Sequence, residues 1–199
     1  MATEPQTCLS ATDYLAFERE AEERHEFVNG QIYARSGASP DHGLIATNLA
    51  RELSLALKNK PCRVHATDLR VKVDETGLYT YPDLVVVCGD SQFDDAKRDT
   101  LLNPLMLVEV LSPSTEAYDR GAKFEHYRRL PSLSCYLLVA QDKPHLELFR
   151  RLEEGLWQLS EASGLEAGLA IPELGVKLAL SEVYDKVSGL GPGLPEAVS

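Results

Sequence analysis

Two short apolar segments, each containing one carboxylate, limit most strongly what this chain can fold into. Residues 105–112 read LMLVEVLS, with Glu109 among aliphatic side chains, and residues 81–88 read YPDLVVVC, with Asp83 near the start. Short runs rich in Val and Leu are typical of strands that are covered on both faces of a sheet. The chain is therefore expected to form a sheet with helices packed on it, with one acid inside each of two strands.

The two acids indicate a metal site. A lone buried carboxylate is costly unless it is neutral, paired or bound to a metal. Strand alternation puts Asp83 on the same face as Val85, and Glu109 on the same face as Leu107. If the two strands are neighbours, both carboxylates project to one side, where they can form an oxygen shell of the kind that Mg²⁺ prefers. The alternatives are a carboxylate paired with a buried Arg or Lys, or a shifted strand.

Local signals place further elements around these strands. Ser10 and Asp13 form a capping-box pattern that opens a helix reaching to about residue 24. Asn29-Gly30 predicts a hairpin, and Pro40 opens a helix that continues to about residue 58. The other expected elements are strands at 62–73, 134–140 and 145–151, an edge strand at 156–162, and short helices at 121–130 and 181–187, the last capped by Ser181.

This order of elements predicts an α/β protein of the mixed α+β kind. Few helices separate the strands, which favours a central mixed sheet flanked by helices, preceded by an N-terminal helix and hairpin. The chain lacks G-x-G-x-x-G and G-x-x-x-x-G-K-[ST], which counts against the phosphate-loop classes. A chain of 199 residues is expected to form a single domain over residues 1–187, with a disordered tail at 188–199.

Composition bounds the compartment and the partners. No apolar run approaches the roughly 20 residues that span a bilayer, and the N-terminus lacks a signal-peptide pattern, so we expect a cytoplasmic protein outside membranes. A net charge of −11 counts against a protein that coats nucleic acid, because such binding relies on Lys and Arg at phosphates. The four cysteines form no C-x-x-C pair, and Cys62, Cys88 and Cys135 are expected to be small buried thiols.

Several segments in combination resemble a known family. The strings are YPDLVVV at 81–87, LVEVLSPST at 107–115, DRGAKFEHY at 119–127 and YLLV at 136–139, with HEFVNGQ at 25–31 and SPDHG at 39–43 before them. Together they resemble the Uma-type putative restriction endonuclease family, which is assigned to the PD-(D/E)XK nuclease superfamily. The resemblance extends from the N-terminal helix to about residue 151. It implies a restriction-endonuclease-like central mixed sheet flanked by helices.

The resemblance also implies the roles of individual residues. Asp83 and Glu109 correspond to the acidic metal ligands, and Val110 would supply a backbone carbonyl; the expected ion is Mg²⁺, with Mn²⁺ as a substitute. The superfamily pattern has a lysine two residues after the second acid, where this chain has Leu111. Lys123 is the candidate for a displaced lysine that orients or deprotonates a water. The structural alternative for Lys123 is a helix pair with the acid four residues before it.

Four residues are candidates for supporting roles. Glu26 is either an additional acid near the metal or a surface strand residue. His42 lies just inside a helix start and either contacts a phosphate or a water of the metal site, or is an exposed loop histidine. The Ser112 hydroxyl is expected to bond a carboxylate or cap the next helix. Tyr127 lies one turn after the candidate lysine and either supports it or packs in the core.

The implied function is metal-dependent DNA endonuclease activity, the hydrolysis of phosphodiester bonds. Arg120 is the candidate nucleic-acid contact, and a homodimer is expected because two related sites cut both strands most simply. The alternative is a nuclease-fold module that is weakly active or inactive and binds nucleic acid or protein. Leu111 and the negative net charge favour it, whereas Asp83, Glu109 and Lys123 count against it. Hydrolysis of other phosphate compounds is a third alternative.

Overall fold

The centre of the molecule is a six-stranded mixed sheet. The computed structural model describes residues 8–35, 37–66 and 68–191, and the strand order of this sheet is β11-β10-β9-β8-β6-β3. β8 and β9 are parallel, and the other neighbours are antiparallel. The strands are β3 (Cys62–Ala66), β6 (Leu84–Cys88), β8 (Met106–Val110), β9 (Cys135–Val139), β10 (His145–Arg151) and β11 (Trp157–Ser163). The predicted mixed sheet and the predicted edge position of the last of these strands are confirmed.

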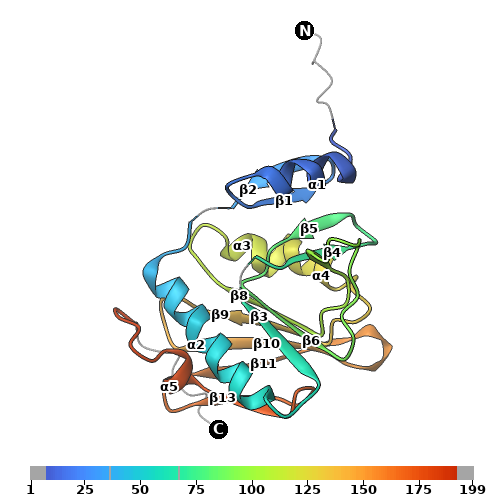
Figure 1. The fold of residues 1–199 in the computed structure, drawn as a ribbon. Helices are drawn as coiled ribbons and strands as arrows, with labels where there is room; N and C mark the ends of the chain where they lie inside the picture. The colour runs from blue at the N-terminus through green and yellow to red at the C-terminus, as the bar shows by residue number, and fades with distance from the viewer. Residues whose placement is uncertain (1–7, 36, 67, 192–199) are drawn as a thin grey trace.

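A second sheet carries the predicted hairpin (Figure 1). Its order is β2-β1-β5-β4-β7. Its strands are β1 (His25–Val28), β2 (Gln31–Ala34), β4 (Arg70–Val73), β5 (Leu78–Thr80) and β7 (Thr100–Leu101). The turn residues Asn29 and Gly30 have φ values of 51° and 77°, as a two-residue type I′ turn requires. This turn fixes the register of β1 and β2.

Different elements cover the two faces of the six-stranded sheet. On one face lie α2 (Pro40–Leu57), the pair β12 (Gly168–Ile171) and β13 (Val176–Ala179), and α5 (Leu180–Val183). On the other lie α4 (Phe124–Tyr127), β4 and β5. Val86 belongs to the first core and Val85 to the second, so β6 is buried on both faces, as its apolar run predicts.

The N-terminal helix α1 (Ala11–Glu20) begins with the predicted capping box. The Asp13 N–H donates to the Ser10 hydroxyl, and the Ser10 N–H donates back to the Asp13 carboxylate. The helix ends at Glu20, before residue 24. Tyr14 stacks on Phe27 of β1, with ring centroids 4.8 Å apart, and this contact holds the helix on the hairpin.

The segment 62–73 is two strands in different sheets, and the prediction of one strand is wrong. β3 remains in the six-stranded sheet, whereas β4 joins the five-stranded sheet. Between them Asp68 has a φ of 55°, a left-handed conformation that interrupts the extended chain. The apolar positions change phase across this break, from 62, 64 and 66 to 69, 71 and 73, a pattern that a bulge within one strand would also give.

The short helix expected at 121–130 begins earlier and is irregular. The chain forms α3 (Glu116–Tyr118), a π-helical turn η1 (Asp119–Lys123) and then α4. Such turns are uncommon and occur often at functional sites. The predicted cap of the last helix is also wrong, because Ser181 lies inside α5 and Ala179 is its N-cap. The elements that were not predicted are β5, β7, η2 (Glu153–Gly155), β12 and β13.

Two of the cysteines are paired. Cys62 and Cys88 lie directly opposite each other on β3 and β6 and form a disulfide, so the expectation of two separate buried thiols is wrong. Cys135 is a buried thiol, as expected, and Cys8 is exposed. The pairing depends on which strands are neighbours, which cysteine spacing alone does not give.

Part of the expected tail packs against the body of the protein. Leu190 contacts the core on the α2 side of the central sheet, and the Gly191 N–H donates to the Asp142 carbonyl. Residues 192–199, for which disorder was predicted, lie outside the described residues. Within the described ranges, no helix is both long and apolar enough to cross a membrane.

Candidate active site

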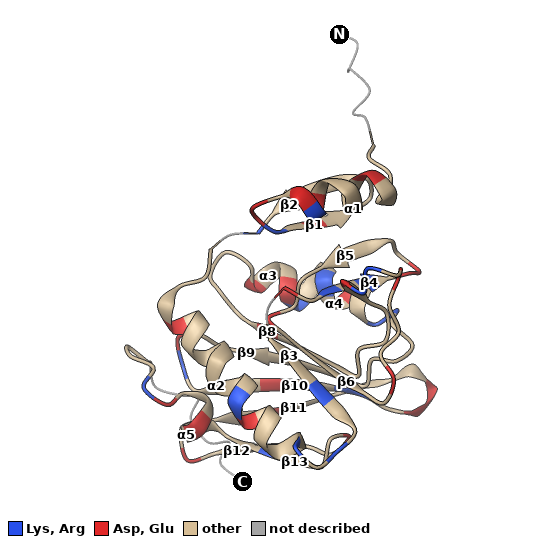
Figure 2. Ribbon diagram, viewed as in Figure 1, with Lys and Arg blue, Asp and Glu red and all other residues tan. Residues whose placement is uncertain are grey.

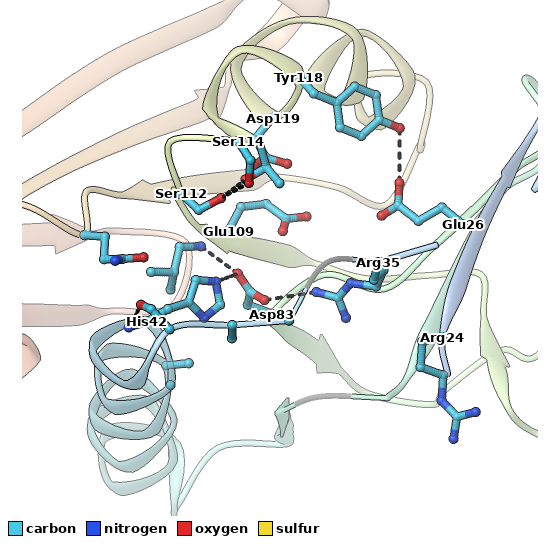
Figure 3. A pocket seen from close by; sticks show the side chains of 18 of the residues that line it. Arg24, Glu26, Arg35, His42, Asp83, Glu109, Ser112, Ser114, Tyr118 and Asp119 are labelled. Carbon is cyan, nitrogen blue, oxygen red and sulfur yellow. Dashed lines mark hydrogen bonds and ion pairs between the residues drawn. The ribbon is translucent and has the colours of Figure 1, made fainter. Parts of the chain in front are cut away.

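A cavity of about 1060 Å³ lies beside the first residues of α2, between the hairpin and the loop that leads from β8 to α3. Figure 3 shows side chains from these elements converging on it. The predicted site residues that line it are Glu26, His42, Asp83, Glu109, Val110, Ser112 and Lys123. The fold thus brings together residues that are up to 97 positions apart in the chain, from Glu26 to Lys123.

Asp83 and Glu109 face the same side of the central sheet. β6 and β8 are antiparallel neighbours with Leu84 opposite Val108, and one further step places Asp83 opposite Glu109. Both are nearly buried, with exposed fractions of 7% and 3%. The same-side arrangement predicted from strand alternation is therefore present.

Asp83 is held by three donors. Its carboxylate accepts from the Val110 N–H at 2.8 Å and the Arg35 guanidinium at 3.2 Å, and it lies 3.2 Å from the His42 Nε2. Burial acts to raise the pKa of Asp83, but the interactions with His42, Val110 and Arg35 outweigh it, so the pKa is lowered. Asp83 is therefore an anion at neutral pH.

Val110 offers its backbone to the same side of the strand. In a β-strand the N–H and C=O of one residue point toward the same neighbour. Because the Val110 N–H reaches the Asp83 carboxylate, its carbonyl also points toward the side where Asp83 lies. This backbone group therefore suits the ligand role that the resemblance implies.

Glu109 has two partners, both nearest to one carboxylate oxygen. Tyr127 donates its hydroxyl to Oε1 at 2.8 Å, and the Lys123 ammonium lies 3.0 Å from the same atom. Burial raises the pKa of Glu109 to about 8; Lys123 opposes this shift, and repulsion from Asp119 and Asp83 adds to it. Burial of Glu109 is thus poorly compensated, and a further cation would stabilise its charged form.

Lys123 lies among three carboxylates at the cavity. It lies 3.0 Å from Glu109, 3.2 Å from Glu26 and 3.3 Å from Asp119, and it is 4% exposed. Burial acts to lower the pKa of Lys123, but these carboxylates raise it well above its usual value. An ammonium has three N–H donors, so the three acids can use all of them. The predicted Asp119–Lys123 pair therefore exists alongside the contact with Glu109.

Glu26 is a buried member of the site, so its alternative as a surface residue is wrong. Its carboxylate accepts from the Thr80 hydroxyl at 2.5 Å and from the Tyr118 hydroxyl at 3.2 Å. Burial acts to raise the pKa of Glu26, but Lys123 and Thr80 outweigh it and the pKa is lowered. Glu26 therefore places a full negative charge beside the lysine.

Ser112 and Tyr127 have different kinds of supporting contact. The Ser112 hydroxyl lies 3.0 Å from the hydroxyls of Ser114 and Thr115, and all three line the cavity. No hydrogen bond from Ser112 to a carboxylate is found among the described residues. Tyr127 does not line the cavity but bonds Glu109 from behind, so it orients the acid.

Arg120 lies outside the cavity. Its guanidinium bonds the Glu147 carboxylate at 2.5 and 2.7 Å, and the Glu116 carboxylate at 2.7 Å. Its donors are directed at acids of the protein. A role for Arg120 in binding nucleic acid has no support from these contacts.

Residues that the sequence did not single out complete the site. Arg35 contacts Asp83, Tyr118 contacts Glu26, and Thr80 contacts Glu26. One of these could have been predicted from the sequence. Counting along the second strand from the Asn29-Gly30 turn places Arg35 at the open end of the hairpin. The others depend on how distant segments pack, so no local signal marked them.

The donor set fits a divalent cation. Among the described residues, four carboxylates of the cavity lie close to Arg35 or Lys123, namely Glu26, Asp83, Glu109 and Asp119. When all four are ionised, as a bound cation would favour for Glu109, the charges of Arg35 and Lys123 leave a formal net charge of −2, and Asp68 and Arg24, which also line the cavity, cancel each other. Carboxylate oxygens are hard donors of the kind that Mg²⁺ prefers, so the ionised group suits a divalent cation.

A second group of potential ligands lies elsewhere. His145, Glu147 and Glu161 bring one ligand atom each within 4.8 Å of one another. The Glu147 carboxylate is held by Arg120, however, and the His145 Nδ1 lies 2.7 Å from the Ser163 hydroxyl. These contacts with Arg120 and Ser163 account for the positions of Glu147 and His145.

Comparison with known proteins agrees with this fold. The family model described as "Uma2: Putative restriction endonuclease" matches residues 11–181. Two uncharacterized proteins of Synechocystis sp. are 35% identical over 176 residues, covering 88% of this chain and 91% of the relative, and 34% identical over 159 residues, covering 80% and 90%. The crystal structure of a protein of Anabaena variabilis, described as a putative nuclease belonging to DUF820, superposes with a TM-score of 0.71 at 16% identity, covering 87% of this chain and 96% of that one. The chain therefore belongs to the Uma2 family.

Proposed function

We propose that this protein is a metal-dependent DNA endonuclease whose site consists of Asp83, Glu109 and Lys123. The observation that carries the proposal is that these three residues, from separate elements, meet in one cavity with the lysine 3.0 Å from Glu109. The description of the Uma2 family as a putative restriction endonuclease supports the same reaction class. The net charge of −2 supports a divalent cation.

The residues would divide the work of phosphodiester hydrolysis. Asp83, Glu109 and the Val110 carbonyl would hold Mg²⁺, or Mn²⁺ in its place, and the bound ion would polarise the phosphate and lower the pKa of a water. Lys123, whose ammonium lies 3.0 Å from Oε1 of Glu109, would orient the attacking water or stabilise charge on the phosphate.

A plasmid-nicking assay tests the proposal. We expect supercoiled DNA to be nicked with Mg²⁺ or Mn²⁺ and left intact with EDTA. Asp83→Asn and Glu109→Gln should each lower the rate by about a hundredfold or more, because each removes a charged ligand of the cation that would stabilise the developing negative charge. Glu75→Gln is the matched control, since this exposed acid lies outside the cavity and pairs with Arg129 on the surface. Nicking that persists with EDTA or in Glu109→Gln contradicts the proposal.

Isothermal titration calorimetry with Mn²⁺ separates binding from catalysis. We expect the wild-type protein to bind Mn²⁺ and Glu109→Gln to bind it more weakly. Wild-type-like Mn²⁺ binding by Glu109→Gln would remove this residue from the ligand set, whatever the plasmid assay shows.

One observation favours the second candidate, an inactive nuclease-fold module. Both Asp83 oxygens have partners within the protein, because Arg35 lies at one and His42 at the other. An acid with such counter-ions is stable without a metal. This alternative predicts DNA or protein binding that is independent of divalent ions, with no nicking under any metal tested.

The proposed partner is DNA, cut by a homodimer in the cytoplasm. Two copies would place one site at each strand of a duplex. Sedimentation of the protein with and without a DNA duplex tests the oligomeric state, and a monomer under both conditions contradicts the dimer. Cell fractionation tests the location.

A further inference from the structure

Two arginines at the open end of the hairpin form a second charged feature of the cavity. Arg24 precedes β1 and Arg35 follows β2, and the Arg35 N–H donates to the Arg24 carbonyl at 2.9 Å. The register pairs His25 with Ala34, so one further step places Arg24 opposite Arg35. Directly opposite residues project from the same face of a sheet. Both side chains line the cavity.

Placing two arginines opposite each other does not stabilise the hairpin. Like charges directly opposite each other destabilise a pair of strands. The protein as a whole carries a net charge of −11, and its Lys and Arg residues are scattered among Asp and Glu (Figure 2). The average composition of the surface therefore does not account for two arginines that lie opposite each other and line an acidic cavity.

The contacts of these arginines within the protein are few. Arg35 is 30% exposed in its side chain, and its guanidinium bonds Asp83 through one nitrogen, although a guanidinium has five N–H donors. Arg24 is 39% exposed, and its nearest carboxylate, on Asp68, is 3.7 Å away, beyond hydrogen-bond distance. Figure 3 shows Arg35 directed at Asp83 and Arg24 extending from the same hairpin away from the carboxylates. By contrast, Lys123 is buried among three acids.

We propose that Arg24 and Arg35 are substrate-binding residues that contact two neighbouring phosphates of one DNA strand, with Arg35 at the phosphate beside Asp83. The inference rests on the proposed endonuclease function and adds the residues that bind the backbone. Opposite Cα atoms in antiparallel strands lie about 5 Å apart, so two long side chains from such a pair can reach successive phosphates. Guanidinium groups bind phosphates through paired N–H donors.

The salt dependence of DNA binding tests the pair. We expect fluorescence anisotropy of a labelled duplex, with Ca²⁺ replacing Mg²⁺, to give a linear fall of log K with log salt concentration. Arg24→Gln and Arg35→Gln should each reduce the slope by about 0.9, and the double variant by about twice that, because each removes one phosphate contact. Arg129→Gln is the matched control: this arginine is 54% exposed, pairs with Glu75 and does not line the cavity.

The outcomes separate this inference from the proposed function. Unchanged slopes in both single variants, in a wild-type protein that binds and nicks DNA, overturn the inference and leave the function standing. A wild-type protein that neither binds nor nicks DNA overturns both. Arg24 does not contact Asp83, so Arg24→Gln should bind Mn²⁺ like the wild type and decides the question even if Arg35→Gln fails to fold.

Discussion

The Lys123 ammonium lies 3.0 Å from the Glu109 carboxylate, although one residue belongs to a π-helical turn and the other to a central strand. Position 111, where the superfamily pattern has a lysine, is a leucine, and Lys123 lies 14 residues after Glu109 in the chain. Leu111 is buried in the core on the face of the central sheet that α4 covers. β8 is therefore followed by an apolar residue at this position, and the positive charge beside Glu109 comes from η1.

Lys123→Met should destabilise the protein strongly. Removing one partner of a buried ion pair leaves uncompensated charge and costs about 3–5 kcal/mol. Here Glu26, Glu109 and Asp119 would all lose their cation. Urea unfolding gives the free energy, and the double variant Lys123→Met/Glu109→Gln should recover part of the loss. Additive losses in the double variant would show that the two residues do not interact.

Tyr127→Phe should weaken the support of Glu109 without creating a cavity. The phenol oxygen is removed and the ring remains, so above about pH 8, where Glu109 is ionised, the loss is that of one hydrogen bond to a charged acceptor, about 1.5–3 kcal/mol. Thermal or urea unfolding measures it. Tyr33→Phe serves as a control on an exposed tyrosine. Equal stability of Tyr127→Phe and the wild type would contradict a charged Glu109 that depends on this bond.

Acid should destabilise the protein partly through Glu147. Burial acts to raise the pKa of Glu147, but the Arg120 guanidinium and His145 outweigh it, and the folded-state pKa lies below 4.5. A lowered folded pKa gives stability that is present above about pH 4.5 and is lost as pH falls through the folded value, because the unfolded chain then binds the proton more readily. Unfolding free energies are measured between pH 6 and pH 3, at intervals of about half a pH unit. They should fall less steeply with falling pH in Glu147→Gln than in the wild type. Slopes identical to the wild type would contradict this contribution.

Reduction of the Cys62–Cys88 disulfide should lower the melting temperature. The bond closes a loop with a sequence separation of 26, for which chain entropy predicts a loss of about 3 kcal/mol. Calorimetry with and without a reductant measures the change, and Cys62→Ser/Cys88→Ser should melt at the temperature of the reduced protein. Cys8→Ser is the control at an exposed free cysteine. Alkylation that labels four thiols in the untreated protein would refute the bond.

The sequence alone determined the local structure and, for two neighbouring strands, the face that their acids share. The runs around Asp83 and Glu109 form buried strands, the Asn29-Gly30 turn forms a hairpin, and Pro40 opens a long helix, because apolar period and turn chemistry act over a few residues. The resemblance to the Uma-type family supplied Lys123. Alternation also put both acids on one side, since that depends only on strand geometry once two strands are neighbours.

Only the tertiary structure decided which distant groups meet. The joining of β6 to β8, the arrival of Arg35 and His42 at Asp83, the position of Glu26 and the cysteine pair all follow from strand order and the paths of loops. The break at Asp68 coincides with a change of phase in the apolar pattern, which does not distinguish a bulge within one strand from a change of sheet. The physical reason is that these contacts gain their free energy from burial and charge neutralisation between segments far apart in the chain, to which local preference does not respond.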